Sequence, residues 1–87
     1  MLTHDGLRVD PSQNYTFFPN CMAEQVMQSY PSETIDTCAK YCDNFYWCRS
    51  LNFYVETGQC DLFSWSARDP EANIAYVPKC AHYSYDP

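Results

Sequence analysis

The chain has 87 residues, the size of one small domain, and its net charge is −6. Its five Lys and Arg residues form no basic run, which argues against nucleic acid, heparin-type polyanions and anionic membranes as main partners. No apolar stretch reaches the roughly 18 residues that a membrane-spanning helix needs, so we expect no membrane insertion.

Six cysteines in so short a chain are the strongest signal in the sequence. An even number of cysteines in a small sequence is typical of secreted domains, whose small core is reinforced by disulfide bonds. The cysteines are Cys21, Cys38, Cys42, Cys48, Cys60 and Cys80, and the middle four follow the spacing C-x3-C-x5-C-x11-C. We therefore expect a secreted, extracellular protein with a structural disulfide framework.

The two ends of the chain differ from its centre. Residues 1–13 lack the apolar core of a signal peptide, so we expect the chain to have been cut from a longer precursor, with an artificial start. Asn14 begins an N-x-T glycosylation sequon, which fits a secreted protein. We expect a partly flexible N-terminal arm over residues 1–17, a folded domain over residues 18–82, and a loose tail over residues 83–87.

Secondary-structure signals begin with an extended segment at Phe17–Cys21. Residues 22–31 stay open, because the spacing of their apolar side chains suits a helix, while a strand with a loop fits equally well. A helix is predicted next, with Ser32 or Thr34 as its N-cap and an end at residues 43–44.

A β-hairpin should follow the helix. Alternating residues predict one strand over Cys48–Val55 and a second over Cys60–Trp65. Residues 56–59 form the turn, in which Gly58 can adopt positive φ. A last short strand is predicted at Ile74–Val77.

Two other uses of the cysteines compete with disulfides. Cys38, Cys42 and Cys48 could supply three ligands of a zinc site, but the two histidines, His4 and His82, show no paired spacing. No CxxC motif occurs, and nothing links a histidine to a thiol, as a reactive cysteine would require. We prefer the disulfide framework and expect no metal or other cofactor, and the residues alone leave the pairing open.

The central segment of the chain resembles the PAN or apple domain family. The resemblance rests on CAKYC, CRSLNFY and CDLFS, in which a helix with C-x3-C precedes a third cysteine, a small residue with aromatics, and C-x-L. Asn52 departs from the pattern, since the family usually has a bulky aromatic residue there. The match covers residues 18–82.

The resemblance implies an α+β fold, in which a single α-helix packs on a curved antiparallel β-sheet and is stapled by disulfides. It implies the pairs Cys21–Cys80, Cys38–Cys60 and Cys42–Cys48. It also implies a non-catalytic extracellular binding or adhesion module that recognises a protein or a carbohydrate. The acidity and aromatic richness are closest in style to modules of larger secreted or membrane-anchored proteins, such as apical extracellular matrix proteins.

The residues themselves show no catalytic motif, so we expect no enzyme. The acidic side chains are interpreted as solvated or capping groups, and these are Asp36, Asp43, Asp61, Asp69 and Glu71.

Aromatic side chains are the natural ligand contacts of a binding module. The candidates are Tyr54, Trp65, Tyr76 and Tyr83, whereas Phe53 and Leu62 are expected in the core. The alternative function is a stand-alone secreted effector, such as a protease inhibitor or toxin-like protein, with a reactive loop within Phe63–Lys79. The oligomeric state is left open.

Overall fold

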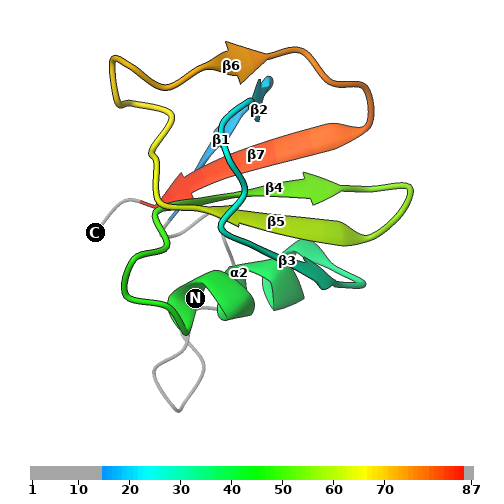
Figure 1. Cartoon of the computed structure of the whole chain (residues 1–87). Helices are drawn as coiled ribbons and strands as arrows, with labels where there is room; N and C mark the ends of the chain where they lie inside the picture. The colour runs from blue at the N-terminus through cyan, green and yellow to red at the C-terminus, as the bar shows by residue number, and fades with distance from the viewer. Residues whose placement is uncertain (1–14, 86–87) are drawn as a thin grey trace.

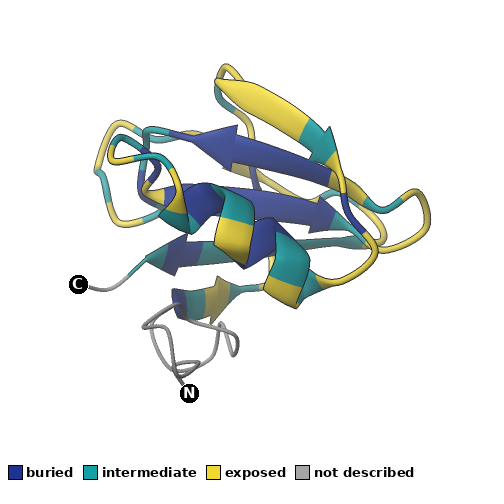
Figure 2. Ribbon diagram, turned by 90° about the horizontal axis from the view of Figure 1, so that it is seen from below, coloured by how far each residue is buried: buried dark blue, intermediate teal, exposed yellow. Residues whose placement is uncertain are grey.

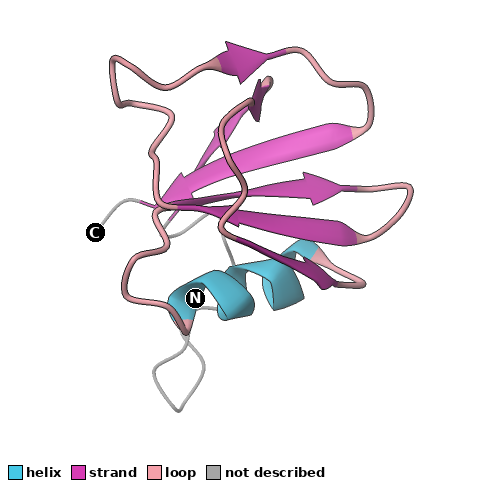
Figure 3. Ribbon diagram, in the orientation of Figure 1, coloured by secondary structure: helices cyan, strands magenta, loops and turns pink. Residues whose placement is uncertain are grey.

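The computed structural model describes residues 15–85 of the chain. Over these residues it contains seven β-strands and one α-helix (Figure 1 and Figure 3). The elements in chain order are β1 (Tyr15–Phe18), β2 (Cys21–Met22), β3 (Gln28–Pro31), α2 (Ile35–Asp43), β4 (Ser50–Tyr54), β5 (Gln59–Phe63), β6 (Ile74–Ala75) and β7 (Cys80–Tyr85).

Five strands form one antiparallel sheet in the order β1-β7-β4-β5-β3. The helix α2 packs against one face of this sheet, and the short antiparallel pair β2–β6 lies over the other face (Figure 1). The central strands β4 and β5 are therefore buried on both faces, and the sheet behind the helix is dark blue in Figure 2. This confirms the predicted fold class, a single helix on an antiparallel sheet.

The helix begins and ends where its capping residues predict. Thr34 is the N-cap, and its side chain accepts a hydrogen bond from the backbone N–H of Thr37 at 3.2 Å. The other candidate, Ser32, instead donates its hydroxyl to the carbonyl of Thr34. Asp36 lies in the first turn, where the helix dipole favours a negative charge, and Asn44 is the C-cap. The buried residues of the helix are Cys38, Ala39 and Cys42.

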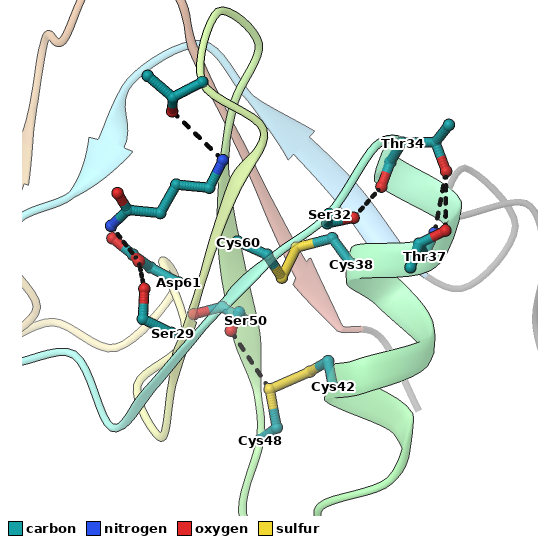
Figure 4. Close-up of a disulfide and its surroundings, with 12 residues drawn as sticks. Ser29, Ser32, Thr34, Thr37, Cys38, Cys42, Cys48, Ser50, Cys60 and Asp61 are labelled. Atoms are coloured by element: carbon teal, nitrogen blue, oxygen red, sulfur yellow. Dashed lines mark hydrogen bonds between the residues drawn. A yellow bond between two sulfur atoms is a disulfide. The ribbon is translucent and has the colours of Figure 1, made fainter.

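Three disulfides join Cys21 to Cys80, Cys38 to Cys60 and Cys42 to Cys48. They are the same pairs that the family resemblance implies. Two of them attach α2 to the β4–β5 hairpin and to the segment before it (Figure 4). On the loop-entropy model, bridges with sequence separations of 59, 22 and 6 are worth roughly 4, 3 and 2 kcal/mol, because they restrict the unfolded chain.

The core between α2 and the sheet is small and depends on these bridges. Leu51 and Leu62 are fully buried there, and Phe53 is nearly so, which confirms the expectation for Phe53 and Leu62. All six cysteine sulfurs are in disulfides. The sulfur atoms of the helix therefore fill core volume that larger apolar side chains would otherwise occupy.

A chain of buried polar groups connects the other face of the sheet to the β2–β6 pair. The side-chain amide of Asn52 accepts a hydrogen bond from the N–H of Met22 at 3.1 Å and donates one to its carbonyl at 3.0 Å. Through these two bonds the side-chain amide of Asn52 pairs with the backbone of β2 as a neighbouring strand would, and they fix the orientation of the amide. Asn52 Oδ1 also lies 2.7 Å from Nδ1 of His82, whose Nε2 lies 2.9 Å from Ser84 Oγ.

Every hydrogen bond of this buried polar network can be formed with a neutral His82. Asn52 Oδ1 is an acceptor, so Nδ1 of His82 carries the ring proton and Nε2 accepts from the hydroxyl of Ser84. Ser84 Oγ in turn accepts from the N–H of Ala67 at 2.9 Å. Burial lowers the pKa of His82 to about 4, because the protonated ring would lose its hydration.

The sheet extends past residues 18–82 at both ends. β1 begins at Tyr15, inside the predicted arm, and β7 continues to Tyr85, so the expectation of a loose tail is wrong for Tyr83–Tyr85. The rings of Tyr15 and Tyr85 lie 5.4 Å apart, and β1 pairs with β7 along its whole length. The two strands come from opposite ends of the described residues and stabilise each other by pairing, and the predicted extended segment at Phe17–Cys21 overlaps only the end of β1.

Other strand bounds also differ from the prediction. Residues 22–31 contain the end of β2, a loop and β3, so the strand-and-loop alternative is the correct one. β4 begins at Ser50 rather than Cys48, because the N–H of Cys48 donates to the carbonyl of Phe45 in a turn. The strands β5 and β6 end earlier than predicted, at Phe63 and Ala75.

Candidate functional site

Two adjoining hollows lie between the edge strand β3, the start of α2 and the β4–β5 turn. Figure 1 shows where these three segments lie in the fold. The first, here called the β3 pocket, has a volume of about 320 Å³ and is lined by Ser29, Tyr30, Pro31, Thr57 and Gln59. The second, the helix pocket, has a volume of about 350 Å³ and is lined by Pro31, Ser32, Glu33, Thr37 and Thr57. Since they share Pro31 and Thr57, they form one continuous feature, the edge groove.

The edge groove depends on a glycine in the hairpin turn. Gly58 has φ of 76°, its N–H donates to the carbonyl of Tyr54, and its own carbonyl accepts from Ser32 N–H at 2.7 Å. A Cβ at this position would overlap the carbonyl oxygen of Ser32. The turn can therefore lie directly against the end of β3 only because residue 58 has no side chain.

The outer edge of β3 is poorly suited to strand addition. Ser32 N–H donates to Gly58, on the β5 side, so the two-residue alternation of an antiparallel pair turns the backbone groups of Ser29 and Pro31 outward. Pro31 has no N–H to offer a further strand. Proline on an edge strand discourages pairing with another chain, so a ligand here would be bound by side chains.

A buried carboxylate lies behind the β3 pocket. Asp61 is only 3% exposed, and its Oδ1 accepts hydrogen bonds from Ser29 Oγ at 2.5 Å and from Gln59 Nε2 at 2.7 Å (Figure 4). Burial, together with the negative charge of Asp61, raises the pKa of Tyr54. The interpretation of Asp61 as a solvated or capping residue is wrong, because β3 and β4 flank β5 on both sides.

The other acidic residues that were expected to be solvated or capping lie in different environments. Asp69 is a capping residue, since its Oδ2 accepts from the N–H of Ser66 at 2.9 Å and forms an ion pair with Arg49 at 3.1 Å. Asp43 accepts the hydroxyl of Tyr15 at 2.8 Å. Asp36 and Glu71 are exposed, as expected.

An aromatic stack continues from the groove along the helix side of β3. The ring of Tyr30 stacks on Tyr41 with centroids 4.4 Å apart and an interplanar angle of 9°, and it lies nearly parallel to Phe45 at 6.2 Å. Phe45 continues the stack to Trp47 at 5.0 Å. These rings pack against the core, so Tyr30 contributes a ring to the groove that is already engaged by its own chain.

The four predicted ligand-contact residues do not converge. Tyr54 is half-buried beside Asp61, on the opposite face of the sheet from Tyr83, which pairs with Leu51. Trp65 is half-buried after β5, while Tyr76 is 75% exposed in the segment after β6. Only Tyr54 adjoins the edge groove, through its strand partner Gln59.

The lining of the edge groove was missed because its residues come from three separated segments. Pro31 ahead of a helix and Gly58 in a turn were the available signals, and neither indicates that the two segments touch. Asn14, the predicted glycosylation site, lies outside the described residues.

Residues 15–85 contain neither a cluster of metal-ligating side chains nor a membrane-spanning helix. This part of the chain contains no group of three or more His, Cys, Asp or Glu side chains placed to hold a metal ion. None of its helical structure is long and apolar enough to cross a membrane. The sulfurs of Cys38, Cys42 and Cys48, which a zinc site or a reactive thiol would require, are in S–S bonds.

Comparison with known proteins agrees with this architecture. A family model described as the PAN domain matches residues 9–86, whereas a search of curated proteins finds no significant match. A solution structure of a PAN module from Eimeria tenella matches with a TM-score of 0.55 and 14% sequence identity, covering 95% of this chain and 86% of that chain. That likeness concerns the fold alone. Because the family model spans most of the sequence, the chain belongs to the PAN domain family.

Proposed function

We propose that this protein is a non-catalytic extracellular binding module that recognises a protein or a carbohydrate through the edge groove. PAN domains are generally extracellular binding modules. Three disulfides in a domain of this size suit an oxidising, extracellular compartment. The observation that carries the proposal is the groove itself, a concave surface lined by both apolar and polar groups.

The proposed wider context rests on the acidity and aromatic richness of the sequence. A module of this kind would act within a larger secreted or membrane-anchored protein, such as an apical extracellular matrix protein, and would contribute adhesion rather than chemistry. The competing function is a stand-alone protease inhibitor or toxin-like effector acting through Phe63–Lys79. The structure offers no observation that favours this second function, so it enters as an outcome of the test.

In the test, the full chain is made multivalent and is applied to a glycan array and to an array of extracellular protein domains. The groove variant is Thr57→Arg, which places a long side chain between the two pockets at an exposed position. The matched control is Ala75→Arg, at an exposed position in β6, a strand that lines neither pocket.

We expect at least one glycan or protein to bind the wild type and the Ala75→Arg variant but not Thr57→Arg. Binding that survives Thr57→Arg would move the site away from the edge groove. Silence on both arrays, together with nanomolar inhibition in a protease panel, would replace the binding module with the effector.

A further inference from the structure

We propose that the β3 pocket binds a cationic side chain, the ammonium of a lysine or the guanidinium of an arginine, presented by a partner protein. This inference rests on the proposed function and deepens it by naming the chemical group that the groove recognises. It is carried by the environment of Asp61, by the orientation of the groups around it, and by the size of the pocket.

The charge of Asp61 has no cationic partner among residues 15–85. Its hydrogen-bonding partners, Ser29, Gln59 and Tyr54, are neutral. Within residues 15–85 the ion pair joins Arg49 to Asp69, so it does not involve Asp61. A carboxylate that is 3% exposed and bonded only by neutral groups keeps a negative potential at the wall of the β3 pocket.

The hydrogen bonds to Asp61 also determine what the pocket wall can offer. The hydroxyl of Ser29 donates its hydrogen to Asp61, so the lone pairs of Ser29 Oγ remain available as acceptors. Gln59 donates through Nε2, so its Oε1 remains an acceptor as well. The outward-turned carbonyls of Ser29 and Pro31 add acceptors along the same edge. A ligand group rich in N–H donors matches this wall.

The charges around the groove have the same sign. No Lys or Arg lines either pocket, and Glu33 lines the helix pocket. Glu33 is exposed, so water screens its charge in the helix pocket, and the adjacent N-terminus of α2 carries partial positive charge. The cationic group is therefore assigned to the β3 pocket, nearest Asp61.

The size and shape of the pocket favour one side chain of a protein. Its volume of about 320 Å³ is at the lower end of the range of roughly 300–1,000 Å³ that ligand pockets span. Sugar binding usually uses an aromatic ring as a stacking platform, but the ring of Tyr30 is already stacked on Tyr41. Pro31 disfavours recognition by an added strand, so a side chain entering the pocket is the remaining mode.

The experiment is a titration followed by 15N–1H NMR, with N-acetyl-lysine methylamide and N-acetyl-arginine methylamide as probes. The neutral probes are N-acetyl-norleucine methylamide, of similar length, and a set of methyl glycosides. We expect the cationic probes to shift the Gln59 side-chain amide and the backbone amides of Ser29 and Thr57, with saturation in the millimolar range. Raising the ionic strength should weaken this binding, because it screens the charge.

Two variants and one control locate the effect. Asp61→Asn keeps the shape but removes the charge, and we expect at least tenfold weaker binding of the cationic probes. Gln59→Lys supplies a tethered ammonium to Asp61, so it should abolish probe binding while leaving the melting temperature unchanged or higher. Glu71→Gln removes an exposed charge elsewhere and should change the affinity less than twofold. If Asp61→Asn fails to fold, Gln59→Lys alone tests the proposal.

Three outcomes would overturn the inference. These are equal shifts with the norleucine probe, binding of a methyl glycoside at the same amides in place of the cations, and unchanged cation binding by Gln59→Lys. The array experiment separates this failure from failure of the proposed function. A partner that binds the wild type but not Thr57→Arg, and is indifferent to Gln59→Lys, would preserve the binding module and remove only the cationic group.

Discussion

Acidification below the ordinary pKa of histidine should destabilise this protein, because His82 is buried in its neutral form. The ring is completely buried between Asn52 and Ser84, and both hydrogen bonds are formed by the neutral tautomer. The ring of Phe18 lies 5.9 Å away, and Asp61 faces the same side of the sheet with Asn52 between them. Protonation would add a donor hydrogen at Nε2, so the Ser84 hydroxyl would have to turn its own hydrogen away, and the charged ring would be buried without hydration.

The magnitude follows from the two pKa values. An unfolded histidine titrates near its ordinary value of 6.5, whereas His82 in the folded protein titrates at about 4. Between these values the unfolded chain binds more protons than the folded one, so stability falls as the pH falls. The slope approaches about 1.4 kcal/mol per pH unit, which gives a loss of about 2 kcal/mol between pH 8 and pH 5. As the pH falls through about 4, the contribution of His82 levels off, because the folded protein then binds the proton as well.

The assay is urea unfolding monitored by tryptophan fluorescence at a series of pH values from 8 to 5, without reductant. The matched variant is His82→Gln, which is less stable overall but has no imidazole at this position. Its free energy of unfolding should vary clearly less with pH than that of the wild type. A wild type with constant stability over this range, or a variant with the same slope, would refute the assignment of a buried neutral imidazole.

Three further predictions concern stability. Gly58→Ala should lower the free energy of unfolding by at least about 1–2 kcal/mol, because alanine disfavours the left-handed backbone and its methyl group would also overlap the carbonyl of Ser32. A thermal melt measures the loss, and an unchanged melting temperature would argue against the close approach of the turn. Asn52→Leu should cost about 2–4 kcal/mol in urea unfolding, because it leaves the backbone of Met22 without both of its partners; a neutral effect would contradict the buried polar chain. Replacing both cysteines of the Cys21–Cys80 bridge by serine should cost roughly 4 kcal/mol, against roughly 2 for Cys42–Cys48, and the reverse order would show that strain or residual structure outweighs loop entropy.

The helix was predictable because its determinants are local. A capping hydroxyl at Thr34, an acidic first turn and cysteines four residues apart all act within a few residues of one another. The hairpin around Gly58 is local in the same sense. These elements could therefore be placed from the sequence to within two residues.

The outer strands and the edge groove could not be predicted, because they are determined by distant partners. β7 is a strand because it lies between β1 and β4, and nothing within the sequence of its own segment distinguishes it from a tail. Asp61 looks like a surface residue until β3 is known to pair beside it. The groove likewise forms only when Pro31 and Thr57 are brought together by that pairing.

The three disulfides are nested along the chain. The bridge from Cys42 to Cys48 lies within the loop closed by Cys38 and Cys60, and both lie within the loop closed by Cys21 and Cys80. Nested loops need no threading, so each bridge can form without obstructing another. A single proteolytic cut between residues 61 and 79 would open only the outermost loop, and the two fragments would stay covalently attached until a reductant separated them.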